Sequence, residues 1–219
     1  MNGVKQHFLL KKKEEDCMSV ILHNGHDALK AIFLSLPERI ILHSKRVTSI
    51  CEVLAKYIPT KFLPENMEEK CYNDAICDAG LYHEIGIFVA RNNVEQRNKA
   101  SKRLLESFGF NEIVLEGVYC FQERYDRKEK NIPFHAHILA IADRVDMIMG
   151  SGKFSKRKAK KATEFIMQNK EMLYNLDAVN CFKTAKEEIF ELYQNEHEGL
   201  QNLCERRLCF ERLQGFELI

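Results

Sequence analysis

The sequence predicts an all-α protein, and three observations lead to this prediction. Apolar residues recur at helical spacing along almost the whole chain, whereas alternation with a period of two between turn residues is hard to find. Leu, Glu, Lys and Ala, which favour helices, are abundant. The 219 residues are 45% hydrophobic with only four prolines and ten glycines. A chain of this length and composition can bury one helical core.

The expected helices can be placed in order along the chain. Pro37 interrupts an apolar segment over residues 28–36 and restarts a helix that continues to about residue 58. After a short loop between Pro59 and Pro64, further helices are expected over residues 65–87, 93–108, 111–125, 133–149, 155–168, 176–193 and 196–213. Gly109 suits a helix end, and residues 126–131 are polar enough to predict an exposed loop.

No linker rich in Pro, Gly or Ser separates these segments, so we expect one helical domain over residues 26–219. It should contain about seven to nine helices. The charged and weakly patterned residues 1–25 are expected to form an N-terminal extension.

The charge balance and the cysteine pattern exclude several classes of protein. The chain has 33 Lys and Arg against 32 Asp and Glu, so no global field favours nucleic acid or an anionic membrane. No segment has the roughly 18 apolar residues of a membrane span or the apolar run of a signal peptide. Eight cysteines without a Cys-x-x-Cys pair predict reduced, mostly buried thiols. We expect a cytoplasmic protein without a nucleic-acid or membrane partner.

Three polar residues, His43, His83 and Asp143, share a face of a predicted helix with apolar residues. The apolar neighbours at helical spacing are Val47, Ile50 and Leu54 for His43; Ile76, Gly80 and Ile87 for His83; and Ala136, Leu139, Ala140 and Met147 for Asp143. A single inward histidine is more often a hydrogen-bonded core residue than a metal ligand, and a single inward acid is commonly an ion-pair partner. Together, the three predict a cluster in space, because buried polar groups need partners.

The order of these residues resembles the HD superfamily of metal-dependent phosphohydrolases. The matching segments are a first histidine in His-Ser-Lys-Arg-Val, a His-Glu doublet in Leu-Tyr-His-Glu-Ile-Gly, and a final Ala-Asp-Arg-Val-Asp. Residues 123–126, 132–134 and 138–146 are similar to the HD-GYP branch in particular, as are the closing segments 154–162 and 175–182. The resemblance covers about residues 28–193 and implies the helical bundle of that superfamily.

The resemblance also implies a metal site and a reaction. Its ligands would be His43, His83, Glu84 and Asp143, with Glu84 and Asp143 also serving catalysis. Imidazoles and carboxylates together suit one divalent transition metal such as Mn, Fe or Zn. The implied chemistry is attack on a phosphate ester by water that the metal has made more acidic.

Several positions depart from the pattern of the HD-GYP branch. Glu84 replaces the aspartate of the doublet, and Ile87 replaces a lysine that follows it. The paired histidines and the intermediate histidine of that branch are replaced too, and so is a glutamate before the first histidine. Their positions hold Phe121 and Gln122, Arg97 or Asn98, and Arg39. The Gly-Tyr-Pro signature is absent from the sequence. A second metal would therefore have almost no ligands.

Two classes of function stay open on this sequence. The first, which we favour, is a degenerate HD-GYP-like signalling domain that binds a nucleotide, such as a cyclic dinucleotide, or a protein partner with little or no turnover. The second is a single-metal phosphohydrolase that acts on a nucleotide. In the first class the metal site may be empty.

Two further features are weighed against simpler explanations. The basic run that contains Lys153 and Arg157 flanks the site in the family, so these two residues are predicted to contact substrate phosphate. Such runs are more often a solvated helix face. An apolar pattern near the C-terminus, from Ile189 to Phe210, either closes the domain or packs against a second subunit in a homodimer.

Overall fold

The structure is a computed structural model that describes residues 27–90, 93–127 and 131–195. Within these ranges the chain forms eight α-helices and no strand, so the prediction of an all-α fold is confirmed. The predicted extension over residues 1–25 and the predicted helix over residues 196–213 lie outside the described residues. None of the helices in the described ranges has both the length and the apolar character that a membrane span needs.

The chain divides into two compact units, Met1–Leu36 and Pro37–Ile219. In the first unit, residues 27–34 are helical, and Leu29, Phe33 and Leu36 are buried. The second unit contains all other described helices and every candidate site residue.

The second unit begins with the helix α2, directly after Pro37. Its elements are α2 (Glu38–Ala55), η1 (Thr60–Phe62), α3 (Glu69–Tyr82), η2 (Ile85–Phe88), α4 (Val94–Ser107), α5 (Glu112–Cys120), α6 (Phe134–Met149), α7 (Lys156–Gln168) and α8 (Leu176–Gln194). Three helices begin after an asparagine, Asn93, Asn111 or Asn175, whose side chain accepts a hydrogen bond from a backbone N–H of the first turn. Such caps satisfy amides that a helix start leaves without a partner.

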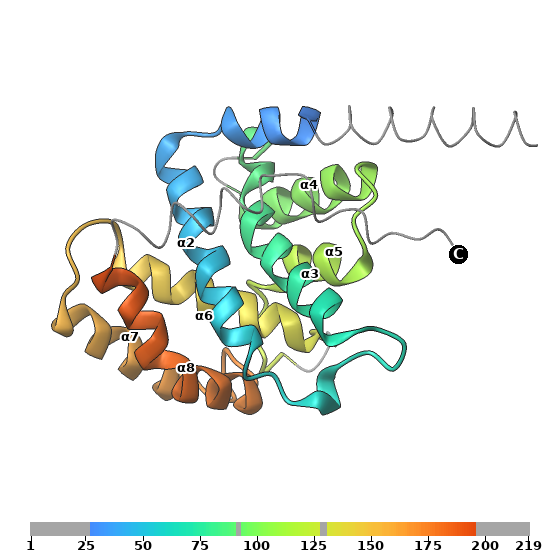
Figure 1. The fold of residues 1–219 in the computed structure, drawn as a ribbon. Helices are drawn as coiled ribbons and strands as arrows, with labels where there is room; N and C mark the ends of the chain where they lie inside the picture. Colours follow the sequence, from blue (N-terminus) through green and yellow to red (C-terminus); the bar gives the residue numbers. More distant parts are fainter. Residues whose placement is uncertain (1–26, 91–92, 128–130, 196–219) are drawn as a thin grey trace, which may run out of the picture. The chain divides into compact units, whose positions relative to one another are not determined.

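The helix α6 lies at the centre of this unit. Of its 16 residues 13 are buried, including Asp143 and Asp146. The helices α2, α3, α5, α7 and α8 all pack against it (Figure 1). Because α6 is enclosed on most sides, its polar side chains have to find partners on these neighbouring helices. Met147, which the spacing predicts on the buried face, is instead 60% exposed.

The helices α2 and α3 approach each other closely at Gly80. A Cβ atom at this position would lie 3.2 Å from the Cα of Thr48 and 3.2 Å from the Sγ of Cys51, both in α2. These separations are tighter than ordinary van der Waals contact. The absence of a side chain at Gly80 therefore lets the last turn of α3, which His83 follows, lie against the part of α2 just after His43.

The helix predicted over residues 65–87 is wrong at both ends, and its C-terminal error concerns the site. The helix α3 ends at Tyr82, His83 follows as its C-cap, and a separate 3-10 helix forms over Ile85–Phe88. The N–H of Gly86 donates to the Oγ of Ser101 in α4 at 2.8 Å instead of continuing the α-helical pattern. This contact turns the chain towards α4 directly after His83.

The helix predicted over residues 111–125 is also too long, because α5 ends at Cys120. The amides of Tyr125 and Asp126 donate to the carbonyls of Leu173 and Met172, at 3.4 and 3.0 Å, rather than to carbonyls one helical turn earlier. A loop after α5 is thus tied to the loop between α7 and α8, and both loops border the cavity described below.

Burial of the cysteines within the described residues agrees with the prediction of mostly packed thiols. Four of the five are buried: Cys51, Cys77, Cys120 and Cys181. Cys71 is exposed.

Gly86 provides a test of the contact between η2 and α4. A Cβ at Gly86 would lie 2.2 Å from the carbonyl oxygen of Arg97 and 2.7 Å from the backbone nitrogen of Ser101, so Gly86→Ala forces a backbone shift. We expect the free energy of unfolding, measured by urea denaturation, to fall by about 2–3 kcal/mol. Gly117→Ala is the control, because its Cβ would approach only side chains, at 3.3 Å or more, and should cost clearly less. Equal losses in the two variants would contradict this view.

Candidate metal centre

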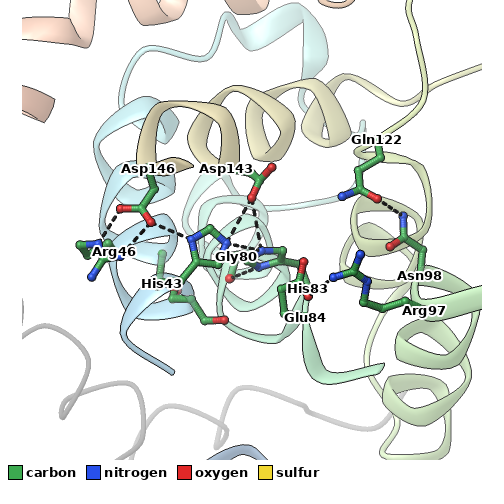
Figure 2. A network of polar contacts seen from close by, with 12 residues as sticks. His43, Arg46, Gly80, His83, Glu84, Arg97, Asn98, Gln122, Asp143 and Asp146 are labelled. Atoms are coloured by element: carbon green, nitrogen blue, oxygen red, sulfur yellow. Dashed lines mark hydrogen bonds and ion pairs between the residues drawn. The ribbon is translucent and has the colours of Figure 1, made fainter. Parts of the chain in front are cut away.

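His43, His83 and Asp143 come together as the sequence predicts, from α2, the end of α3 and α6 (Figure 2). The Nε2 atoms of His43 and His83 are 3.2 Å apart. The Oδ1 atom of Asp143 lies 3.2 Å from the first and 3.7 Å from the second. Three ligand atoms thus form a small triangle, and all three side chains are buried or nearly so.

The other ring nitrogen of each histidine is already hydrogen-bonded. His43 Nδ1 donates to Asp146 Oδ2 at 2.7 Å, and His83 Nδ1 donates to the carbonyl oxygen of Gly80 at 2.7 Å. These bonds place the proton of each neutral imidazole on Nδ1 and leave the lone pair on Nε2. Both lone pairs then point into the triangle. This outer hydrogen bond is the usual companion of a metal-binding histidine.

The triangle has the chemistry and the spacing of a cation site. Two imidazole lone pairs and a carboxylate oxygen would repel one another at these distances unless a positive charge lay between them. Neighbouring ligands of a tetrahedral zinc ion with bonds of about 2.0–2.1 Å lie about 3.3 Å apart, which is close to the separations found here. The three residues therefore fit a divalent transition metal.

In the protein without a metal, a proton takes the place of this positive charge. Burial lowers the pKa of His43, but the hydrogen bonds and charges of Asp143 and Asp146 outweigh it and raise the pKa to about 9. Burial raises the pKa of Asp143, and the hydrogen bonds and charges of His43 and His83 reverse this and hold it well below its usual value. The cluster thus attracts cations in general.

Asp146, one turn after Asp143 in α6, is the main outer partner of the triangle. Besides His43, it accepts hydrogen bonds from Arg46 Nε at 2.6 Å and Arg46 Nη2 at 3.0 Å. The hydroxyl of Tyr193, near the end of α8, donates to Asp146 Oδ1 at 2.7 Å. Asp146 is 1% exposed, so this network is shielded from water. It fixes the orientation of the His43 ring.

Glu84, predicted as a fourth ligand and as a catalytic residue, is directed elsewhere. Its Oε2 atom accepts a hydrogen bond from Arg97 Nη1 in α4 at 2.7 Å (Figure 2). It does not belong to the group of ligand atoms that lie together in the described part of the chain. Glu84 is only 7% exposed, so its ion pair with Arg97 is largely shielded from water.

The positions that hold further histidines in the HD-GYP branch form a neutral polar contact here. The Nδ2 atom of Asn98 donates to the Oε1 atom of Gln122 at 3.3 Å (Figure 2). Phe121 packs edge-on against the ring of His83, with ring centroids 5.3 Å apart. Together with the guanidinium of Arg97, these side chains offer a second metal no cluster of His and carboxylate ligands.

A cavity of about 550 Å³ opens beside the triangle. His43, Glu84 and Asp143 line it, as do three arginines, Arg97, Arg124 and Arg144. A volume of this size is typical of sites for small molecules. The predicted phosphate contacts Lys153 and Arg157 are exposed and are not among its lining residues, so their role stays a prediction.

The sequence reasoning missed Asp146, Arg46 and Tyr193. Asp146 could have been found, because it follows Asp143 by three residues and therefore shares its helix face. Arg46 follows His43 by three residues in the same way. Nothing in the spacing points to Tyr193, since its contact with Asp146 spans 47 residues.

We predict that the network around Asp146 supports metal binding. Asp146→Asn should weaken the affinity for Mn²⁺ or Zn²⁺ by about 10- to 100-fold, because His43 loses its ionic acceptor. Tyr193→Phe removes one hydroxyl and should cause a smaller loss in the same direction. Tyr57→Phe is a matched control, because it also removes a tyrosine–carboxylate hydrogen bond, to Glu188, away from the site. Equal affinities in wild type and Asp146→Asn, measured by competition with a chelator, would refute this role.

Metal affinity should also rise with pH. His43 keeps its extra proton up to about pH 9 in the metal-free protein, and a metal has to displace this proton. The apparent affinity is therefore expected to increase about tenfold per pH unit between pH 7 and 9 and to level off above pH 9. Titration in a chelator-buffered metal series checks this slope. A flat dependence would mean that His43 is not a ligand.

Comparison with known proteins agrees with the geometry. Residues 40–148 match the family model described as "HD domain", a range that begins within α2, ends within α6 and includes all three members of the triangle. A search of curated proteins found no match. The helical fold, the cluster of two histidines and an aspartate, and the family match support one conclusion: residues 40–148 are an HD domain of the metal-dependent phosphohydrolase superfamily.

Proposed function

We propose that this chain is an HD-GYP-like domain that holds one divalent metal and binds a nucleotide with little or no turnover, in a signalling role. The observation that carries the proposal is that only three of the four predicted ligands lie together. His43, His83 and Asp143 keep a compact ligand triangle, whereas Glu84 is paired with Arg97. This arrangement supports metal binding without efficient catalysis, because the three ligands lie together while the carboxylate of Glu84 is held by Arg97.

Each residue of the site has a distinct proposed role. His43, His83 and Asp143 would hold the metal, and Asp146 orients His43. A divalent metal bound there would supply Lewis acidity towards a phosphate oxygen. Glu84 lines the same cavity and would be a candidate for a general base, but its Oε2 atom is engaged by Arg97.

The arginine pairing also supports one metal rather than two. A second metal would need further carboxylate or imidazole ligands of its own. Here the guanidinium of Arg97 supplies the positive charge next to Glu84, and Asn98 and Gln122 are neutral. The resemblance to the HD-GYP branch supports a ligand from the nucleotide or cyclic dinucleotide class.

A single-metal phosphohydrolase is the second candidate. The observation that favours it is the cavity, because the same 550 Å³ space is lined by His43, Asp143 and Glu84. A phosphate ester in this cavity would reach the metal-binding residues directly. The two candidates differ in turnover and not in where the ligand binds.

Metal stoichiometry and turnover test the proposal together. Elemental mass spectrometry of the purified protein after Mn²⁺ loading should find about one metal per chain. Asp143→Asn should lose it, whereas Glu84→Gln should keep it, because Glu84 contributes to an ion pair with Arg97 rather than to the triangle. Wild type should bind nucleotides in calorimetry but hydrolyse bis(4-nitrophenyl) phosphate only slowly.

Other results of these experiments would contradict parts of the proposal. Two metals per chain, or loss of the metal in Glu84→Gln, would contradict the assignment of Glu84. Rapid hydrolysis by the Mn²⁺ form, absent in Asp143→Asn, would favour the phosphohydrolase. A folded protein that takes up no metal under any of these conditions would overturn both candidates.

A further inference from the structure

Arg144 stands out among the three arginines that line the cavity. Arg97 is paired with Glu84, and Arg124 makes two hydrogen bonds with Asp126. Arg144 has no carboxylate partner among the residues that the structure describes, and its Nε atom is buried without a hydrogen bond in that part of the chain. A guanidinium so placed beside a metal centre is suited to receive an anion.

The surroundings of Arg144 hold its guanidinium in place. Its Cζ atom lies 5.1 Å from the centre of the Phe165 ring in α7, within the range of a cation–π contact. Tyr174, in the loop before α8, lies close enough for the charge of Arg144 to act on its hydroxyl. Tyr174 is 4% exposed, and both Arg144 and Tyr174 line the cavity. A pre-oriented guanidinium loses little side-chain entropy when it binds a ligand.

The tyrosine adds a donor to this arrangement. The Tyr174 hydroxyl lines the same cavity as Arg144, and its O–H can donate to an oxygen of a ligand there. Burial raises the pKa of Tyr174 to about 12, so the hydroxyl keeps its proton at neutral pH. Arg144 and Tyr174 can therefore address two oxygens of one anion, a pattern that suits phosphate.

The charge of the cavity indicates whether a phosphomonoester or a phosphodiester fits it better. Its lining contains three arginines and three carboxylates, Glu84, Glu123 and Asp143, which cancel. A divalent metal in the triangle would leave a surplus of two positive charges, which a phosphomonoester dianion balances. A cyclic dinucleotide would present two separate diester groups, but only Arg144 of the three arginines lacks a carboxylate partner in the described ranges.

The rest of the cavity is suited to an apolar or flat body. Val94 and Met147 are 43% and 60% exposed at its edge, and Phe121 lines it further in. A nucleobase has faces that pack against such side chains.

We propose that Arg144 and Tyr174 form the phosphate subsite of this cavity and select a nucleoside monophosphate over a cyclic dinucleotide. This inference rests on the proposed function, because it assigns the ligand of the same site. It gives the role of phosphate anchor to α6 and the loop before α8, and not to the basic run at Lys153 and Arg157.

Calorimetry on the full Mn²⁺-loaded chain tests the subsite, with inorganic phosphate, adenosine and guanosine monophosphate, and cyclic di-guanylate as probes. Arg144→Gln should weaken phosphate and monophosphate binding at least tenfold, and Tyr174→Phe about threefold. Arg144→Lys keeps the charge but loses the planar guanidinium with its several donors. Its affinity for phosphate should therefore lie between those of Arg144→Gln and wild type. The exposed Arg103→Gln, on α4, is the control for loss of one positive charge. Metal content, measured on the same samples, should not change.

The outcomes separate this inference from the proposed function. If wild type binds monophosphates and Arg144→Gln and Arg144→Lys both bind them equally well, the subsite is wrong and the proposed function stands. The same holds if Arg157→Gln, rather than Arg144→Gln, loses binding, or if cyclic di-guanylate binds more tightly than the monophosphates. If metal-loaded wild type binds none of the probes, both the subsite and the proposed nucleotide ligand are overturned.

Discussion

Two carboxylates on the central helix determine how the rest of this domain is arranged. Asp143 and Asp146 lie one turn apart on α6, and both are buried. An unpaired carboxylate in such a place would cost several kcal/mol, so each needs positive or hydrogen-bonding partners at fixed positions. These partners come from α2, the end of α3 and α8. The polar network therefore specifies which turns of these helices face α6.

Backbone contacts then set the position of His83 within this network. Gly80 allows α3 to lie against α2, and the carbonyl of the same residue orients the His83 ring. Directly afterwards, Gly86 lies against the backbone of α4, and the chain turns towards that helix. The turn separates two adjacent side chains, so that His83 faces Asp143 while Glu84 faces Arg97.

The sequence alone predicted the fold and the centre of the site, but not its surroundings. His43 and Asp143 lie within regular helices, where apolar residues at helical spacing reveal the direction of a side chain. His83 was recognised despite a wrong helix end, because family order identified it. The partners of Glu84 and Asp146 depend on contacts between distant segments, such as Tyr193 with Asp146, and these have no local pattern. The paired loops at Tyr125 and Leu173 were missed for the same reason.

The segments after residue 148 complete a site whose centre lies within the HD match. Tyr193 of α8 bonds to Asp146, and through it acts on the ring of His43. Tyr174, in the loop before α8, lines the cavity together with Arg144, the residue next to Asp143. One C-terminal segment thus contributes to the surroundings of the metal-binding residues through Tyr193 and to the cavity through Tyr174. A displacement of α8 would therefore affect both the orientation of His43 and the lining of the cavity, because Tyr193 and Tyr174 belong to the same stretch of chain.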